Sequence, residues 1–281
     1  MSVAIETTDW QPAPARAREP FVAIGDIHGA SHLLRALRER LEQETSAKRI
    51  YLGDLIDPSP KYVPNHNVPD VLDQVAEDLD CGGEALAGNH ELMMLDFVNC
   101  ARAKTYPNMK WDTWPRYNNG CDTLSGWMPG LQFWADADID GAAIRVFDEL
   151  MTDAQRSVFR RLKLWLHLGK YIFVHGGFER FDLAHQKRAL NWWKTPVPSS
   201  KYAFHPQWGR FLTSDEAPPK KVQINGHQIM RRPFVGEQRI QIDTGAKIGG
   251  PLTAVEIVGD RLRFHHACPP GVTMSSWARQ K

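Results

Sequence analysis

Short, largely apolar segments alternate with amphipathic ones over the first hundred residues of the chain. The segments 21–24, 49–52 and 84–87 are apolar enough to be buried strands. Between them, 33–44 and 69–79 carry apolar residues at helical spacing, which predicts two amphipathic helices. Strand and helix thus alternate in the pattern of a βαβ sheet, so the sequence predicts an α/β fold.

The C-terminal third is rich in strand-like segments joined by glycine-containing turns. They are 222–225, 239–243, 252–258 and 261–266. Short strands linked in this way predict a second sheet made mostly of antiparallel pairs. His265 and His266 lie apart from the glycine-flanked loops, and we expect them on a strand surface.

Between residues 99 and 169 the alternation of strand-like and helix-like segments stops, which predicts a helical insertion rich in tryptophan. Its segment 106–134 holds four tryptophans, Trp111, Trp114, Trp127 and Trp134. Either these aromatics pack on the main sheet or their faces form a substrate platform, and packing is favoured because aromatic side chains chiefly supply buried area. A capping box at Thr152 predicts a helix through about residue 167.

Residues 1–19 are rich in proline, alanine and charge, so we expect a poorly ordered tail before a single domain over 20–281. The net charge is +1, which gives no support to nucleic acid as the main partner. No run approaches 18 apolar residues, and the N-terminus lacks the blocks of a signal peptide. Four cysteines without a C-x-x-C pair fit a reducing compartment, so we expect a cytoplasmic protein that does not contact a membrane.

Five strand-like segments end in a glycine beside a polar side chain. In chain order, the polar residues at the ends of these five segments are Asp26 and His28, Asp54 and Asp57, Asn89 and His90, His175, and His227. Open α/β sheets bind ligands outside the carboxyl ends of their strands. Carboxylate oxygen and imidazole nitrogen suit Mn, Fe and Zn, so these positions predict a divalent metal site.

Such side chains can support hydrolysis of a phosphoester. Two metal ions a few ångströms apart need a bridging carboxylate, for which Asp54 is the natural candidate. A hydroxide bound to the metals can then attack phosphorus. The leaving oxygen needs a proton donor. His90 could give that proton, with Asp57 orienting the imidazole.

The motifs GDIHG, GDLID, GNHE, VHGG and NGH, in this order, resemble the calcineurin-like metallophosphoesterase superfamily. They are most similar to its phosphoprotein phosphatase type, with bacterial, phage and diadenosine-tetraphosphatase-like members. WPRYNNGCDTLSGW (114–127) and IDTGAKIGGPLTAVEI (242–257) resemble two further elements of bacterial members. The resemblance implies a four-layer α/β/β/α sandwich and two divalent metal ions, Mn²⁺ foremost, with Fe or Zn as alternatives.

The resemblance also implies a role for each residue. One metal would be held by Asp26, His28 and Asp54, and the second by Asp54, Asn89, His175 and His227. His90 would be the general acid, paired with Asp57.

One departure concerns phosphate binding. Where the family usually has an arginine after GDxxD, this chain has Pro58, which offers no charge. Lys194 stands where a second phosphate-binding arginine is common, and we expect it to contact substrate. Other substitutes are Lys61, Arg180 and Arg210, which the sequence does not rank.

We therefore expect a phosphatase that hydrolyses phosphomonoesters on a phosphoprotein or a small phosphorylated metabolite. The alternatives are a dinucleoside-polyphosphate hydrolase, which Glu91 after GNH disfavours, and a catalytically inactive binding module, which Pro58 keeps open. A nuclease is disfavoured because Ile229 replaces the last histidine of the nuclease motif.

Overall fold

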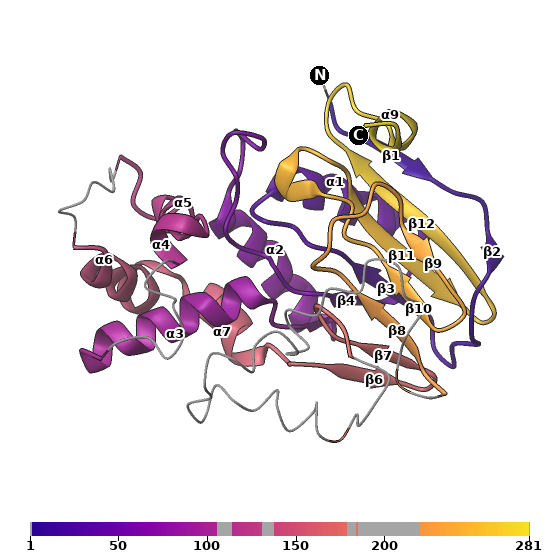
Figure 1. The fold of residues 1–281 in the computed structure, drawn as a ribbon, viewed down its shortest axis with the longest axis horizontal. Coiled ribbons are helices and arrows are strands. Elements are labelled where there is room, and N and C mark those ends of the chain that lie inside the picture. Colours follow the sequence, from indigo (N-terminus) through magenta and orange to yellow (C-terminus); the bar gives the residue numbers. More distant parts are fainter. Residues whose placement is uncertain are drawn as a thin grey trace.

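The computed structural model describes residues 2–105, 114–130, 138–178 and 220–280, together with Ala184 and Pro218. Its strands form two mixed sheets, and helices flank them (Figure 1). The predicted α/β sandwich is therefore confirmed.

The first sheet has seven strands, and the parallel strands that carry three of the predicted motifs lie at one side of it. Its order is β1-β12-β11-β3-β4-β5, and β2 pairs with β12. The strands are β1 (Ala4–Thr7), β2 (Gln11–Pro12), β3 (Phe21–Ile24), β4 (Lys48–Tyr51), β5 (Glu84–Ala85), β11 (Leu252–Val258) and β12 (Arg261–Cys268). β3, β4 and β5 are parallel, whereas β11 is antiparallel to both β3 and β12.

The second sheet has five strands in the order β6-β7-β8-β10-β9. They are β6 (Leu166–Leu168), β7 (Tyr171–Phe173), β8 (Val222–Asn225), β9 (Phe234–Val235) and β10 (Arg239–Gln241). The prediction that the C-terminal strands form one mostly antiparallel sheet is wrong, because β8 is parallel to both β7 and β10 while β11 and β12 join the first sheet. The physical reason is that β11 is buried on both faces and needs cover from both sides.

The two faces of the first sheet enter different cores. In β3, Val22 and Ile24 pack with the helices, whereas Phe21 and Ala23 pack between the two sheets. The ring of Phe21 lies edge-on to Phe173 of β7, with centroids 5.1 Å apart. This alternation, with period two, locks the sheets face to face and brings their strand ends together.

Helices α1 (Ser31–Glu44) and α2 (Val68–Asp80) pack on the outer face of the first sheet. The insertion forms a separate cluster of helices beside the sheets (Figure 1). It consists of α3 (Asn89–Ala103), α4 (Trp114–Tyr117), α5 (Gly120–Ser125), α6 (Ile139–Arg145), the π-helix η2 (Val146–Leu150) and α7 (Asp153–Arg161). Trp114 is buried against Phe97, as the packing interpretation expects. Trp111 and Trp134 lie outside the described residues.

The predicted helix after Thr152 begins as expected but ends early. The Thr152 side chain caps α7, and Gln155 completes the capping box. The helix stops at Arg161 instead of continuing to 167, because Leu166–Leu168 pairs with β7 as strand β6. Pairing with the neighbouring strand outweighs the helical pattern in this segment.

The N-terminal segment is not a disordered tail, which corrects the expectation for residues 1–19. β1 pairs with β12 from Ala4 to Thr7, and the amide of Ala17 donates to the carbonyl of Gly259 at 2.7 Å. Composition indicates disorder here, but the open edge of β12 supplies the backbone partners that order the segment.

The same pairing corrects the expectation for His265 and His266, which are buried instead of lying on a surface. His265 Nε2 lies 3.1 Å from the Glu256 carboxylate, and His266 Nδ1 lies 2.8 Å from the Thr253 hydroxyl. The chain ends with the short helix α9 (Met274–Ala278), and the 3-10 helix η5 (Ala246–Ile248) precedes β11. None of the described helices has the length and apolarity needed to cross a membrane.

Candidate metal centre

Loops at the carboxyl ends of five strands meet at one edge of the sandwich. They bring together all eight residues whose spacing predicted a metal site. Asp26 and His28 follow β3, Asp54 and Asp57 follow β4, Asn89 and His90 open α3 after β5, His175 follows β7, and His227 follows β8. These side chains come from positions up to two hundred residues apart in the sequence.

The backbone of these loops adopts conformations that side chains rarely take. Four site residues have a positive φ: His28 (46°), Asp54 (52°), Asp57 (61°) and His227 (68°). The neighbouring glycines leave room for the carboxylates. A Cβ on Gly88 would lie 2.0 Å from Asp54 Oδ1, and one on Gly226 would lie 1.9 Å from Asp26 Oδ1. Strain of this kind is typical of functional sites.

The Asp54 carboxylate lies at the centre of the cluster. Its Oδ2 is 3.4 Å from His28 Nε2 and 3.3 Å from His175 Nε2. Two groups of possible ligands share it, namely Asp54 with His28 and His90, and Asp54 with His175 and His227. Within each group the ligand atoms lie within 4.8 Å of one another. The arrangement is that of two candidate cation sites bridged by one carboxylate.

Hydrogen bonds orient the imidazoles toward this carboxylate. His28 Nδ1 lies 2.8 Å from the carbonyl of Ile56, and His175 Nδ1 lies 2.9 Å from the carbonyl of Leu52. A carbonyl only accepts, so each Nδ1 carries a proton and each Nε2 faces the centre. Burial opposes a positive charge on His175, but Asp54 and Asp26 outweigh it and raise the pKa of His175 to about 10. The Asn89 side-chain oxygen lies 3.0 Å from His175 Nε2.

The donors present fit divalent cations. Asp26 Oδ2 accepts a hydrogen bond from the amide of His227 at 2.9 Å, while its buried Oδ1 has no partner in the described part of the chain. Burial, with Asp243 and Asp54 nearby, raises the pKa of Asp26 well above its usual value. Burial opposes ionisation of Asp54 too, but His175 and His90 outweigh it and hold the pKa of Asp54 well below its usual value. Carboxylate oxygens and imidazole nitrogens crowded together in this way suit Mn, Fe or Zn.

His90 and Asp57 form the predicted pair beside this cluster. His90 Nδ1 lies 2.6 Å from Asp57 Oδ2. Asp57 also accepts hydrogen bonds from the indole N–H of Trp114 at 2.7 Å and the hydroxyl of Thr123 at 2.6 Å. Burial raises the pKa of Asp57 to about 7 and lowers the pKa of His90 to about 3. Burial thus disfavours the charged form of both groups, and His90 Nε2 lies 3.9 Å from Asp54 Oδ2.

Sequence reasoning missed the residues that hold this geometry. Trp114 and Thr123 belong to the 114–127 segment. The resemblance of this segment to family members was the sequence feature that pointed to a role for these residues. Glu91 accepts hydrogen bonds from the amides of Asp54 (2.9 Å), Leu55 (2.8 Å) and Gly88 (2.8 Å). Its signal was the capping-box position three residues after Gly88.

Two further charged residues near the centre were not predicted. Asp243 is buried and raises the pKa of Asp26. The ammonium of Lys247, on η5, lies 3.4 Å from His90 Nε2. Both stand in the 242–257 segment. Lys194, Arg180 and Arg210 lie outside the described residues, and the ammonium of Lys61 lies over the ring of Tyr62 at 5.1 Å from its centroid.

A family-wide comparison matches residues 19–231 to the calcineurin-like phosphoesterases. The chain therefore belongs to the calcineurin-like phosphoesterase family, and the family predicted from the motifs is confirmed. It is a metallophosphoesterase whose fold holds two candidate metal sites.

Two solved structures illustrate the shared fold. A candidate diadenosine tetraphosphatase is 14% identical, with a TM-score of 0.51, and the match covers 90% of this chain and 95% of that one. A cold-active protein-tyrosine phosphatase from the psychrophile Shewanella sp. is 18% identical, also with a TM-score of 0.51, and the match covers 87% and 77% of the two chains. At these identities the likeness concerns the fold alone. No curated protein sequence is a significant match.

Proposed function

We propose that this protein is a phosphatase that hydrolyses phosphomonoesters, carried by a phosphoprotein or a small metabolite, with two divalent cations as cofactors and manganese as the foremost candidate. The observation that supports the proposal most strongly is the position of Asp54. Its carboxylate lies between two groups of imidazole ligands, as a bridging ligand of a two-metal site must.

The residues divide between two cations. In this proposal Asp26, His28 and Asp54 hold one, and Asp54, Asn89, His175 and His227 hold the other. Bound cations of this kind lower the pKa of a coordinated water, so that it can attack phosphorus, and they neutralise the charge of the phosphate. The hydrogen bonds on His28 and His175 fix which ring nitrogen faces each cation.

His90 and Asp57 manage the proton that the leaving oxygen requires. The 2.6 Å contact between them fixes the orientation of the His90 ring and puts its Nε2 on the side of Asp54. In its protonated form, which the Asp57 carboxylate stabilises, His90 can donate a proton from Nε2 to the departing alkoxide and return to neutral imidazole.

Lys247 can supply the positive charge that Pro58 does not. Its ammonium lies 3.4 Å from His90 Nε2, beside the group that we propose as the proton donor. A lysine contributes a point charge in place of the bidentate contact an arginine makes. Lys194 remains a second proposed contact for substrate.

An asparagine at Asp54 tests the proposal with little change of shape. Wild-type protein loaded with manganese should hydrolyse an aryl phosphate, and the matched variants Asp54→Asn and His90→Asn should lose at least about a thousandfold in kcat. Asp148→Asn, on an exposed part of η2, is the control and should retain activity. Full activity of a metal-loaded Asp54→Asn protein would refute the assignment.

Substrate class is tested separately by comparing kcat/KM for a phosphopeptide, a sugar phosphate and diadenosine tetraphosphate. Clear preference for either monoester supports the proposal. Preference for diadenosine tetraphosphate would instead support the dinucleoside-polyphosphate hydrolase. A protein that is inert and binds no added manganese would support the catalytically inactive binding module. The free cysteines fit the further proposal that the protein is cytoplasmic.

A further inference from the structure

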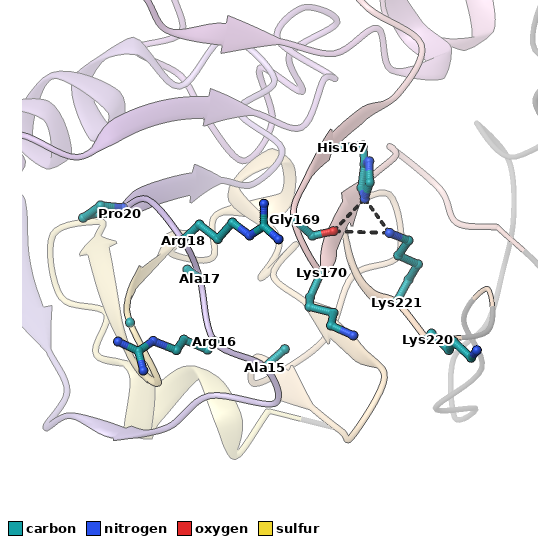
Figure 2. Close-up of a pocket in the computed structure, with 11 residues that line it drawn as sticks. Ala15, Arg16, Ala17, Arg18, Pro20, His167, Gly169, Lys170, Lys220 and Lys221 are labelled. Carbon is teal, nitrogen blue, oxygen red and sulfur yellow. Dashed lines mark hydrogen bonds between the residues drawn. The ribbon is translucent and has the colours of Figure 1, made fainter.

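A large basic pocket lies between the N-terminal segment and the second sheet (Figure 2). Its volume is about 1300 Å³. Five cationic side chains line it, from three separate parts of the chain: Arg16, Arg18, Lys170, Lys220 and Lys221. Its described lining includes no Asp, Glu, Phe, Tyr or Trp. The whole chain carries a net charge of only +1, so this pocket concentrates positive charge locally.

The pocket is distinct from the candidate metal centre, because it lies at the opposite ends of the same strands. β7 begins after Lys170 and leads to His175, and β8 begins after Lys221 and leads to His227. His175 follows Lys170 by five positions in the sequence, which corresponds to roughly 16 Å at the rise of an extended chain. An anion bound at one end therefore does not contact the other.

Hydrogen bonds hold the walls of the pocket in place. On one side, the amide of Ala17 donates to the carbonyl of Gly259 at 2.7 Å. On the other side, the ammonium of Lys221 lies 3.2 Å from the carbonyl of Gly169 and 2.6 Å from His167 Nε2 (Figure 2). Arg18 extends from the first segment toward Gly169 of the second, beside Lys170 and Lys221, whereas Arg16 and Lys220 point away from each other at the rim (Figure 2).

Cations gathered without acidic partners repel one another, and an anion that enters between them removes this repulsion. Guanidinium and ammonium groups form strong charge-assisted hydrogen bonds with phosphate oxygens. The volume exceeds what a single phosphate fills. Because the described lining has no aromatic ring of Phe, Tyr or Trp, it offers no platform on which nucleic-acid bases could stack.

We propose that this pocket binds a small anion that carries several linked phosphate groups, held by Arg18 from one wall and by Lys170 and Lys221 from the other. The phosphate chain is the recognised part. It can be free inorganic polyphosphate or the polyphosphate moiety of a nucleotide.

The test measures binding of inorganic tripolyphosphate and of ATP by isothermal titration calorimetry, without added divalent metal. All proteins carry Asp54→Asn, which prevents turnover. The pocket variant adds Arg18→Gln and Lys170→Gln. Its matched control adds Arg145→Gln and Arg279→Gln, which remove the same charge from exposed positions on α6 and next to α9.

We expect one equivalent of tripolyphosphate to bind the parent protein. Affinity should fall at least about tenfold in the pocket variant and less than twofold in the control, and it should weaken as salt screens the charges. Equal binding of ATP identifies a nucleoside polyphosphate as the source, whereas tripolyphosphate alone identifies the free polyphosphate. Circular dichroism and the melting temperature of each variant establish that it is folded.

Several outcomes would overturn the proposal. They are an absence of saturable binding, an equal loss in the pocket variant and the control, and tighter binding of a single-stranded oligonucleotide than of tripolyphosphate in a manner that depends on Arg18 and Lys170. None of them bears on the metal centre, whose test uses hydrolysis.

Discussion

Replacing Thr123 with valine removes one hydroxyl from the support of Asp57 and nearly preserves the volume of the side chain. The Thr123 hydroxyl donates to Asp57 Oδ1 at 2.6 Å and accepts from the amide of Asp57 at 2.9 Å. Both partners are buried, so the valine leaves a carboxylate oxygen and a backbone N–H short of a hydrogen bond. Unpaired buried groups cost about 1–3 kcal/mol each, so we expect the free energy of unfolding to fall by about 2–6 kcal/mol.

The same change should also weaken proton donation by His90. Burial raises the pKa of Asp57 to about 7, and the Thr123 hydrogen bond opposes this rise. Without that bond the pKa increases further, Asp57 is protonated at higher pH, and it stabilises the His90 imidazolium less well. Loss of a supporting contact of this kind costs about 10- to 100-fold in activity.

The assay is kcat for a series of phosphate monoesters whose leaving groups differ in pKa, measured with manganese. If His90 protonates the leaving oxygen, Thr123→Val should lose little with a nitrophenolate and progressively more as the leaving group becomes more basic. His90→Asn should show the same trend more steeply. Ser125→Ala is the control, because its hydroxyl lies in the same helix and donates to the carbonyl of Asp122 instead.

A loss of kcat in Thr123→Val that is the same for every leaving group would contradict a role of Thr123 in proton donation. That outcome would mean that the hydroxyl acts on stability alone. An unchanged kcat across the series in a variant that is measurably less stable would equally separate Thr123 from the acid pair.

Two further predictions concern the charged side chains of Lys247 and Glu256. Lys247→Met should raise KM for an aryl phosphate about tenfold, because one charge-assisted contact is lost. Lys247→Arg should restore KM in part, and an unchanged KM in Lys247→Met would contradict the proposed phosphate contact. Burial alone would raise the pKa of Glu256, but hydrogen bonds from His265 and Arg263 outweigh it and lower the pKa from 4.5 to about 2. Its stabilisation is therefore complete above pH 4.5 and lost as pH falls toward 2. Glu256→Gln should cost about 1–2 kcal/mol at pH 7, with a shallower acid limb in denaturant titrations, and an equally steep limb would count against it.

The sequence predicted the ligands because their signal is local. Each stands within a few residues of a glycine at the end of an apolar strand, as Asp54 and His175 do. Parallel strands present their carboxyl ends at one edge, so convergence follows from the strand pattern without knowledge of the packing. Five such ends specify the site even though the sequence gives no distances.

The supporting contacts could not be predicted because they join distant parts of the chain. Trp114 and Thr123 reach Asp57 from 57 and 66 residues away. The side chain of Thr7 meets His265 across 258 residues. The amino-acid composition of residues 1–19 describes only the segment itself, and the free edge of β12 that orders it is a property of the completed sheet.

The geometry of the metal centre is held by the chain itself, and Glu91 explains how. Left-handed backbone at His28, Asp54, Asp57 and His227 costs about 1–2 kcal/mol for each residue, or roughly 4–8 kcal/mol together. A loop left to relax would lose this conformation. The buried Glu91 carboxylate, however, accepts hydrogen bonds from the amides of Gly88, Asp54 and Leu55 and so ties the loop after β4 to the start of α3. Burial raises the pKa of Glu91 to about 7. Hydrogen bonds of this kind contribute about 0.5–3 kcal/mol each, enough to offset the strain at Asp54. The ligands are therefore oriented by the protein before a cation arrives, which is the arrangement that an efficient catalytic site requires.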